Sequence, residues 1–406
     1  MLPGINIEFD NGNLDTVVST ADGVFGLLAS AVAVVDKFEL NKAYQIKNMA
    51  DVANLGILPD VNNYVLYRWL EKFYEEAGEG TKLWIMGRAK TEVVSFWFTP
   101  DVATGVTPAK KLYDASNGEI SISFTAYAGT TEVVIENGMD ADVPLAKSKS
   151  QTFNDLYTTE NFAPVFTILE AYAFTGEHDD LLTLLEGSDN RVGIFVGNTE
   201  KRTGDVTING CSTSVLAGRL ARIGVHENAG KRLTGSLATL TAYIVDLPVE
   251  EFDVEALHDK GFITFRTHIR KSGYWISDDP LATDPANDDY SHITRRRVID
   301  KALRVAHNIA GEQILNDFDV TNEGKVDPIY AKNVEGDIER EIAAQMDGEI
   351  SRDSTNRDDF GVVAEFDKNA VVSATSRTNI KIRVRPKTMN RFIEINLGYA
   401  VNLENV

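Results

Sequence analysis

Hydrophobic and polar residues alternate most clearly near the end of the chain, in residues 378–401. Two runs, separated by Pro386, carry hydrophobic side chains at or near every second position, with Lys or Arg between them in the first run. The hydrophobic members of the two runs are Ile380, Ile382, Val384, Phe392, Ile393 and Ile395. Such alternation predicts β-strands with one solvent-exposed face. The two strands need a sheet to join, either in their own chain or in a neighbouring subunit.

A shorter alternation lies at the other end of the chain, at Ile5, Ile7 and Phe9. It is followed by Asn, Gly and Asp residues, with no adjacent run that could complete a hairpin. The pattern predicts a single strand on a flexible arm. A lone strand at one end and an extra strand at the other are what strand addition between subunits requires.

Between these ends, hydrophobic runs alternate with helical periodicities. Helices are predicted at 62–77, 109–115, around Phe153, 165–174, 212–223, 251–258, 293–316 and 337–346. Strands are predicted at 83–86, 93–98, 119–124, 132–136, 192–196, 240–245, 262–267 and 360–366. The acidic, proline-containing stretch 278–289 is predicted to be a surface loop. This alternation of strands and helices predicts an α/β or α+β fold.

The hydrophobic run at residues 23–35 (GVFGLLASAVAVV) follows acidic residues rather than a basic segment, which argues against a secretory signal peptide. The run is also too short to span a bilayer. We interpret it as a buried strand or helix. The protein is accordingly expected to be made and folded in a cytoplasm.

The length of 406 residues suits two or three domains, or one core domain with large insertions. The formal net charge of −21 argues against a general nucleic-acid binder, because phosphate contacts need a basic surface. Cys211 is the single cysteine, so neither an intrachain disulfide nor a thiolate metal cluster can form. Six scattered histidines offer few ligands for a transition metal.

Candidate chemistry is sparse. Residues 319–327 resemble the beginning of a calcium loop, but Tyr330 stands where a bidentate carboxylate is needed, so we predict a turn. Residues 197–204 follow an apolar strand as a phosphate loop would, but lack the Gly-Lys-Ser/Thr ending. Three histidines lie near acidic residues, as expected in so acidic a chain: His258, His268 and His292. These observations predict no catalytic residues, no cofactor and no metal site.

Residues 293–304 (ITRRRVIDKALR) are basic within this acidic chain. On a helix, Arg297, Lys301 and Arg304 would share one face. The opposite, hydrophobic stripe would consist of Val298, Ala302, Val305 and Ile309. Two interpretations are open: a solvated basic face, or a surface that docks an acidic partner through charge complementarity.

Six stretches, taken in order, carry a resemblance to a known family. They are PGINI at 3–7, the helix, glycine turn and strand at 64–88, the helix at 212–232, the strand and glycine hairpin at 257–276, the arginine-rich segment at 290–304, and the two C-terminal strands. Their order resembles the sheath proteins of contractile phage tails and related contractile injection machines, particularly the compact sheath-like family of Bacteroidetes phages and prophages. Two positions depart from the family pattern: Asn228-Ala229-Gly230 replaces a Pro-Gly loop, and Asp278-Asp279-Pro280 replaces a Gly-Ala-Arg-Thr-Leu run.

The resemblance implies a core domain built from N- and C-terminal segments, with an inserted middle domain and extended terminal strand arms. The implied boundaries are 1–20 for the N-terminal strand arm, 21–90 and 191–376 for the two parts of the core domain, 91–190 for the inserted outer domain, and 377–406 for the C-terminal strand arm.

The resemblance further implies a structural subunit rather than an enzyme. Such subunits form hexameric rings, stacked helically around an inner tube, and contract to drive the tube through a target envelope. The implied partners are other copies of the chain, the inner tail tube protein, and baseplate and tail terminator proteins, with no nucleic acid and no direct membrane insertion. The implied location is a phage tail or phage-like particle, assembled in the cytoplasm of a bacterial host.

Within that family the terminal strands would pair with neighbouring subunits, through Ile5, Ile7 and Phe9 and through the hydrophobic members of 380–395. We further interpret Arg297, Lys301 and Arg304 as facing the tube. Alternatives are a ring-forming tail or surface protein that does not contract, and an enzyme whose site we do not recognise.

Overall fold

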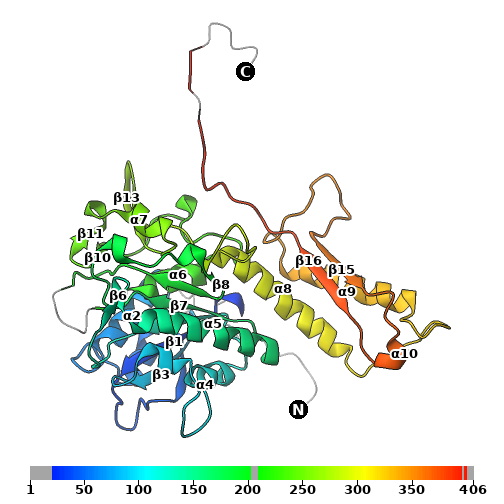
Figure 1. Ribbon diagram of the computed structural model, residues 1–406, viewed down its shortest axis with the longest axis horizontal. Coiled ribbons are helices and arrows are strands. Elements are labelled where there is room, and N and C mark those ends of the chain that lie inside the picture. Colours follow the sequence, from blue (N-terminus) through cyan, green and yellow to red (C-terminus); the bar gives the residue numbers. More distant parts are fainter. Residues whose placement is uncertain (1–20, 203–208, 396, 400–406) are drawn as a thin grey trace, which may run out of the picture.

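The computed structural model describes residues 21–202, 209–395 and 397–399. In these ranges the chain has a mixed α/β structure with a larger and a smaller hydrophobic core, which lie next to each other along the longest axis (Figure 1). The N-terminal strand with Ile5, Ile7 and Phe9 lies outside the described residues and stays a prediction.

The larger core is built on a six-stranded sheet with the strand order β2-β3-β1-β4-β7-β9. Its strands are β1 (Phe25–Ala31), β2 (Ala43–Ile46), β3 (Leu83–Ala89), β4 (Ile122–Ala126), β7 (Phe166–Glu170) and β9 (Val192–Phe195). Strand β2 runs antiparallel to β3, and the other five strands are parallel. Taken in chain order, the parallel strands stand in the order 2-1-3-4-5, a common order of doubly wound sheets.

Helices cover both faces of this sheet. They are α2 (Tyr64–Ala77) and α6 (Thr213–Arg222) on one face, and α4 (Pro108–Ala115) and α5 (Asp142–Asn161) on the other. Phe124 of β4 packs against Trp69 of α2, with 6.0 Å between ring centroids, and also against Phe25 of β1. Gly26 follows Phe25 in β1, and a Cβ added to Gly26 would instead contact Leu112 of α4. Since successive strand residues point to opposite faces, α2 and α4 lie on opposite sides of the sheet.

Shorter elements complete this part of the chain. The helices are α1 (Met49–Asn54), α3 (Val94–Trp97) and α7 (Val254–Asp259). Two pairs of short strands are β5 (Ile135–Glu136) with β6 (Met139–Asp140), and β8 (Ser188–Asp189) with β14 (Ala282–Thr283). Two further pairs are β10 (Tyr243–Ile244) with β11 (Leu247–Pro248), and β12 (Phe265–His268) with β13 (Lys271–Ile276). None of the described helices combines the length and hydrophobicity that crossing a membrane requires.

The smaller core belongs to the C-terminal part of the chain, at the right of Figure 1. Its elements are α8 (Ile293–Glu312), α9 (Pro328–Gln345), β15 (Val362–Phe366), α10 (Val372–Thr375) and β16 (Ile380–Val384). Strands β15 and β16 form an antiparallel two-stranded sheet that packs with α9. The hydrophobic stripe predicted on α8 belongs to this core: Val298, Ala302, Val305 and Ile309.

The predicted turn at 319–327 is confirmed. Val320 and Val326 form an isolated bridge around Gly324, whose φ is +72°. Asp327 then begins α9, because its side chain accepts hydrogen bonds from the backbone N–H groups of Ile329 and Tyr330. An acidic residue of the calcium-like pattern is therefore a helix cap.

The predicted α/β class is confirmed, but three elements differ in type from the prediction. The second C-terminal run is predicted to be a strand, whereas its described residues 392–395 form no strand. The pattern predicts a strand at 93–98, where the structure has the short helix α3. It predicts a helix at 165–174, where the structure has β7. All residues of β7 are buried, so the run shows no period of two, and periodicity alone does not distinguish such a strand from a buried helix.

The observed arrangement also differs from the implied domain boundaries. Residues 91–190 do not stand apart from the core, because their strands β4 and β7 pair in the middle of the central sheet. Residues 377–406 are not an arm throughout, because β16 pairs with β15 of the same chain. The division between the hydrophobic cores falls in the first turn of α8, after the acidic stretch 278–289. This stretch is not a surface loop throughout, because residues 279–283 are buried and include β14.

Candidate assembly surfaces

Helix α8 lies between the two cores, and Arg297 points into the protein. Arg297 is 4% exposed, and its guanidinium donates hydrogen bonds to the carbonyls of Leu220 (3.1 Å), Ile223 (3.4 Å) and Gly224 (3.5 Å) at the C-terminal end of α6. A cation here complements the negative end of the α6 dipole. Burial lowers the pKa of Arg297 to about 10, so the side chain stays charged near neutral pH.

The next two basic side chains of α8 are also engaged within the chain. Lys301 forms ion pairs with Asp22 (2.6 Å) and Glu349 (2.8 Å). Arg304 donates hydrogen bonds of 2.6–2.9 Å to carbonyls in the loops that lead into β4 and β7: Gly118, Ile120 and Pro164. Arg297 is thus buried, which corrects its interpretation as part of a solvated or tube-facing surface. Lys301 and Arg304 lie on the same face of the helix but are only partly buried and line an open groove, so contact of these two residues with a tube stays a prediction.

A buried charge cluster strengthens the same contact. Asp300 accepts hydrogen bonds from Arg296 (2.9 Å) and Arg191 (3.2 Å), and all three side chains are buried. The Arg296 guanidinium also lies 4.5 Å from the centroid of the Tyr290 ring. Loss of one partner would leave an uncompensated buried charge, so the cluster favours a fixed contact between α8 and the larger core.

A groove runs alongside this contact, between α8 and the amino-terminal edge of the central sheet. Its volume is about 970 Å³, and its walls include Lys82, Phe162 and Gln345. Phe162 is 54% exposed and stacks on His307 at 4.7 Å between ring centroids. The groove is open and of mixed polarity, and nothing in the described residues covers it.

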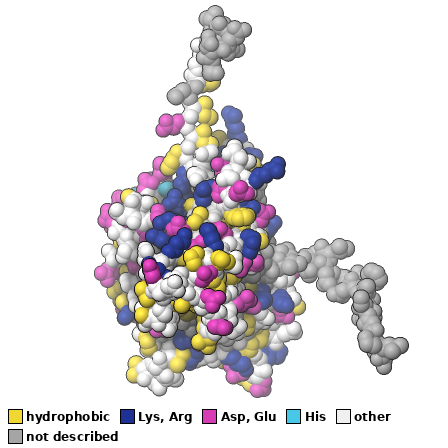
Figure 2. Space-filling view, turned by 90° about the vertical axis from the view of Figure 1, so that its right-hand side faces the viewer, with side chains coloured by type: hydrophobic (Ala, Val, Ile, Leu, Met, Phe, Trp, Pro, Cys, Tyr) yellow, Lys and Arg dark blue, Asp and Glu magenta, His cyan; other side chains and the backbone are white. Residues whose placement is uncertain are grey.

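The C-terminal tail, residues 391–399 with 396 not described, extends away from both cores (Figure 1). Phe392, Ile393 and Ile395 are 87%, 72% and 81% exposed. Figure 2, which faces the smaller core, shows the tail rising above the surface with its hydrophobic side chains uncovered. Contiguous exposed hydrophobic surface of this kind is typical of interaction sites.

The residues predicted to pair between subunits therefore fall into two groups. Ile380, Ile382 and Val384 belong to β16, which pairs with β15 of its own chain while its other edge has no strand neighbour among the described residues. Phe392, Ile393 and Ile395 belong to the exposed tail. Pairing with a neighbouring subunit stays a prediction for both groups.

Arg391 fixes the base of the tail to the larger core. Its guanidinium pairs with Asp278, and its Nη2 lies 3.1 Å from Asp279 Oδ1. Asp279 is 1% exposed and also accepts hydrogen bonds from the backbone N–H of Thr294 (2.9 Å) and from Asn228 Nδ2 (2.7 Å). The exposed segment thus begins from a fixed point on its own subunit.

The same acidic pair has shifted protonation equilibria. Burial and the charge of Asp278 raise the pKa of Asp279 to about 7. Burial would raise the pKa of Asp278 as well, but its hydrogen bond with His258 and the charge of Arg391 outweigh it and lower that pKa. Asp278, Asp279 and His292 each place a ligand atom within 4.8 Å of the others. Arg391, Asn228 and Thr294 already occupy the carboxylates, so we assign no metal to this cluster.

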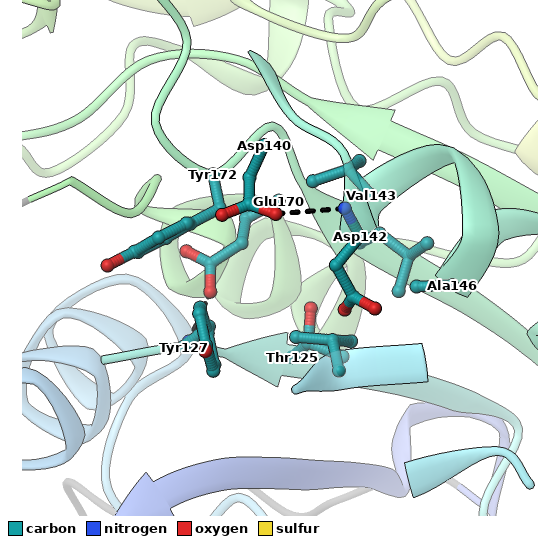
Figure 3. A pocket seen from close by; sticks show the side chains of 10 residues that line it. Thr125, Tyr127, Asp140, Asp142, Val143, Ala146, Glu170 and Tyr172 are labelled. Atoms are coloured by element: carbon teal, nitrogen blue, oxygen red, sulfur yellow. Dashed lines mark hydrogen bonds between the residues drawn. The ribbon is translucent and has the colours of Figure 1, made fainter. Parts of the chain in front are cut away.

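At the carboxyl ends of the parallel strands, where doubly wound sheets commonly bind ligands, side chains fill the space. Figure 3 shows Glu170, at the end of β7, among Tyr127, Tyr172 and Asp140. The cavity left there is about 10 Å³, close to the volume that one water needs. Glu170 is 3% exposed and accepts hydrogen bonds from the backbone N–H groups of Tyr127 and Cys211, while burial raises its pKa to about 8.

This buried acid predicts a pH-dependent stability. Between its unfolded pKa of 4.5 and its folded pKa of about 8, Glu170 holds a proton in the folded state that it loses on unfolding. The free energy of unfolding should therefore fall as pH rises, by up to about 1.4 kcal/mol per pH unit. Urea unfolding between pH 6.5 and 8 measures the slope, above the range in which His292, with a pKa lowered to about 4 by burial, acts in the opposite direction. Glu170→Gln should make the slope less steep, leaving the part that Asp279, with its pKa raised to about 7, contributes in the same direction, and an unchanged slope in this variant would contradict the assignment.

Family models match both parts of the chain. The model described as "DUF2586, N-terminal domain" matches residues 2–280, and the model described as "DUF2586, C-terminal domain" matches residues 289–404. The gap between the two matches lies in the loop before α8, next to the point where the two cores separate. No curated protein has a significantly similar sequence.

Solved structures share the fold at low sequence identity. A chain in the cryo-EM structure of the anti-feeding prophage baseplate, 6-fold symmetrised, has a TM-score of 0.63 and 14% identity, covering 98% of this chain and 99% of that chain. A chain of the same baseplate in the contracted state has a TM-score of 0.60 and 14% identity, with 100% of each chain covered. The sheath tail protein of Desulfitobacterium hafniense has a TM-score of 0.51 and 10% identity, covering 95% and 100%. The chain belongs to the DUF2586 family, and over almost its whole length it has the fold found in these baseplate and sheath structures.

Proposed function

We propose that the protein is a structural subunit of a contractile tail sheath, in a phage tail or a phage-like injection particle. Its copies would stack as hexameric rings in a helix around an inner tube, and contraction would drive the tube through a target envelope. The fold shared with a sheath tail protein and with chains of the anti-feeding prophage baseplate supports this proposal. The observation that carries it is an exposed hydrophobic tail, together with a two-stranded sheet whose β16 edge has no strand neighbour among the described residues.

The acceptor for the tail, in this proposal, is the β15–β16 sheet of a neighbouring copy. Two-stranded sheets are only marginally stable and gain from a third strand. Ile380, Ile382 and Val384 are only partly buried against the smaller core, so an added strand would extend their hydrophobic cover. Addition of an extended segment to a sheet edge also supplies main-chain hydrogen bonds.

Tail and acceptor are complementary in pattern and charge. In the tail, Ile393 and Ile395 flank Glu394, so a strand there would present hydrophobic residues on one face and an acidic residue on the other. On the acceptor, Lys381 and Arg383 are exposed on the face opposite α9. A tail strand that turned its isoleucines toward the smaller core would place Glu394 beside these two cations.

The Arg391 contact favours pairing with another copy. It holds the base of the tail on the larger core of its own subunit, and the tail then points away from its own β16 (Figure 1). A contact in which the tail of one copy binds the sheet of the next is heterologous, so it generates a ring where the rotation closes and a helical filament where it does not.

The mechanical part of the proposal rests on α8. Because α8 is bound to the larger core by buried charged side chains and contributes its hydrophobic stripe to the smaller core, each subunit would rotate as one body during contraction while the tail strand keeps neighbours joined. The N-terminal strand with Ile5, Ile7 and Phe9 is proposed as a second link between copies. The inner tube, baseplate and tail terminator proteins are the proposed partners beyond the chain itself.

Electron microscopy of the purified, concentrated protein tests the proposal. Rings or helical tubes are the expected result. Particles that stay monomeric at every concentration and ionic strength would contradict it. Tubes of two kinds, one longer and narrower and one shorter and wider, would identify a contractile sheath. A single helical form under all conditions would instead favour the second candidate, a ring-forming tail protein that does not contract.

A further inference from the structure

We infer that the β15–β16 sheet accepts a strand at the β16 edge only, because two glutamates of α9 close the β15 edge. The occupant is the C-terminal tail of a second copy. This inference rests on the proposed function and specifies which of the two edges forms the contact between subunits.

The register of the two strands shows which backbone groups point outward. Arg385 N donates to Gly361 O (2.8 Å), and Asp367 N donates to Asn379 O (2.9 Å). These pairs are therefore hydrogen-bonded pairs of the antiparallel ladder. Along each strand, the backbone N–H and C=O groups of successive residues point alternately toward the partner strand and away from it. Ala364, which lies opposite Ile382, and Phe366 consequently direct their N–H groups away from β16, toward the outer edge of β15.

Of the three outward N–H groups of β15, those of Ala364 and Phe366 are bound by carboxylates of α9, whereas that of Val362, opposite Val384, is not a donor to either carboxylate. Ala364 N donates to Glu339 Oε1 (2.9 Å), and Phe366 N donates to Glu335 Oε1 (2.8 Å). Glu335 is 2% exposed, and its other carboxylate oxygen accepts a hydrogen bond from Lys332 (2.8 Å). A foreign strand at this edge would have to displace both carboxylates and leave Glu335 buried without its backbone donor.

The spacing of the two glutamates matches the strand. Four residues of an α-helix rise about 6 Å. Two residues of a β-strand span about 6.8 Å, which is the distance between successive outward N–H groups. Glu335 and Glu339 are therefore spaced to accept from the backbone N–H groups of Phe366 and Ala364, respectively, and α9 lines this part of the β15 edge. Charged groups and covering helices are known means of protecting a sheet edge.

The β16 edge has the opposite character. Ile380, Ile382 and Val384 lie at non-hydrogen-bonded positions of the ladder, so their N–H and C=O groups point outward. In the part of the chain that the structure describes, no strand lies on that side of β16. Lys381 and Arg383 stand between these residues and are exposed, which suits the Ile393-Glu394-Ile395 pattern of the tail.

Disulfide trapping in assembled, full-length protein tests the choice of edge. Val363 and Arg383 are matched positions, because they lie directly opposite each other and are both exposed on the same face of the sheet. Arg383→Cys or Val363→Cys is combined with one tail cysteine, placed in turn at Phe392, Glu394 and Asn396. A strand beside β16 lies about 4.8 Å from it but about 9.6 Å from β15, and a disulfide spans only about 4.4–6.8 Å between Cα atoms. Cys211 is buried, and burial raises the pKa of its thiol to about 12, so it does not compete.

Disulfide-linked dimers with Arg383→Cys and none with Val363→Cys are expected. Linkage through Val363→Cys, or tubes without linkage at either edge, would overturn the inference while leaving a sheath function standing. Absence of tubes from the unmodified protein would contradict the proposed function itself.

A second comparison tests the role of the glutamates. Glu335→Ala with Glu339→Ala should open the β15 edge and allow linkage through Val363→Cys. Glu335→Gln with Glu339→Gln keeps the acceptor oxygens and should leave that edge closed. If the Ala variant folds but still forms no disulfide through Val363→Cys, the carboxylates do not close the edge.

Discussion

Removal of residues 392–406 is expected to abolish rings and tubes while leaving the free energy of unfolding unchanged. The tail is exposed, so the two cores lose no described packing when it is removed. An added strand that makes about four main-chain hydrogen bonds at 0.5–1.5 kcal/mol each contributes about 2–6 kcal/mol to each contact between copies. The concentration needed for assembly should therefore rise at least about 30-fold. Sedimentation and electron microscopy measure assembly, and urea unfolding measures stability.

A longer truncation provides the contrast. Removal of residues 377–406 also takes away β16, the partner of β15 and part of the smaller core. Its loss of assembly would therefore be accompanied by a loss of stability. Only the shorter truncation, which retains Arg391 and its contact with Asp278, separates the two effects. Tubes formed by the shorter chain would show that the tail is not the link between subunits.

Arg304→Met is expected to lower the free energy of unfolding by about 3 kcal/mol. Methionine keeps much of the aliphatic length of arginine but donates no hydrogen bond, and three carbonyls that accept from Arg304 would lose this donor, at about 1 kcal/mol each. The loss should appear in urea unfolding of the protein in dilute solution, where no partner is present. It would reflect weakened attachment of α8 to the larger core.

Arg295→Met is the matched control. Arg295 lies on the same helix but is exposed, and its nearest acceptor is the carbonyl of Asp289 at 3.5 Å. The substitution removes the same charge and should change the free energy of unfolding by less than about 0.5 kcal/mol. Equal, small effects of the two substitutions would favour the interpretation of Arg304 as part of an exposed docking face.

The residues of α8 show how far a local pattern reaches. The helix itself, its hydrophobic stripe and the shared face of Arg297, Lys301 and Arg304 all follow from the spacing of side chains on a helix. What covers that face does not follow from spacing. The acceptors of Arg297 and Arg304 are carbonyls of loops that precede β4 and β7 and of the end of α6, and backbone carbonyls carry no sequence signature.

The strands of the central sheet show a related limit. Strands β1 and β9 lie within predicted hydrophobic runs, whereas β7 was assigned to a helix. Strands buried on both faces lose the alternation that distinguishes them. Periodicity therefore does not place β7 in the sheet.

Side-chain spacing along the chain was enough to predict the α/β class, most helices and strands, and the hydrophobic positions of the two C-terminal runs, of which only the first is a strand. These properties depend on residues a few positions apart, and periodicity reports them directly. Only the tertiary structure decided that β16 pairs within its own chain, that α9 closes one edge of its sheet, and that Arg391 fixes the tail to Asp279. The physical reason is distance along the chain: Arg391 and Asp279 are 112 residues apart, and Arg304 and Ile120 are 184 apart. Contacts of that range are set by how whole elements pack, and no local pattern encodes them.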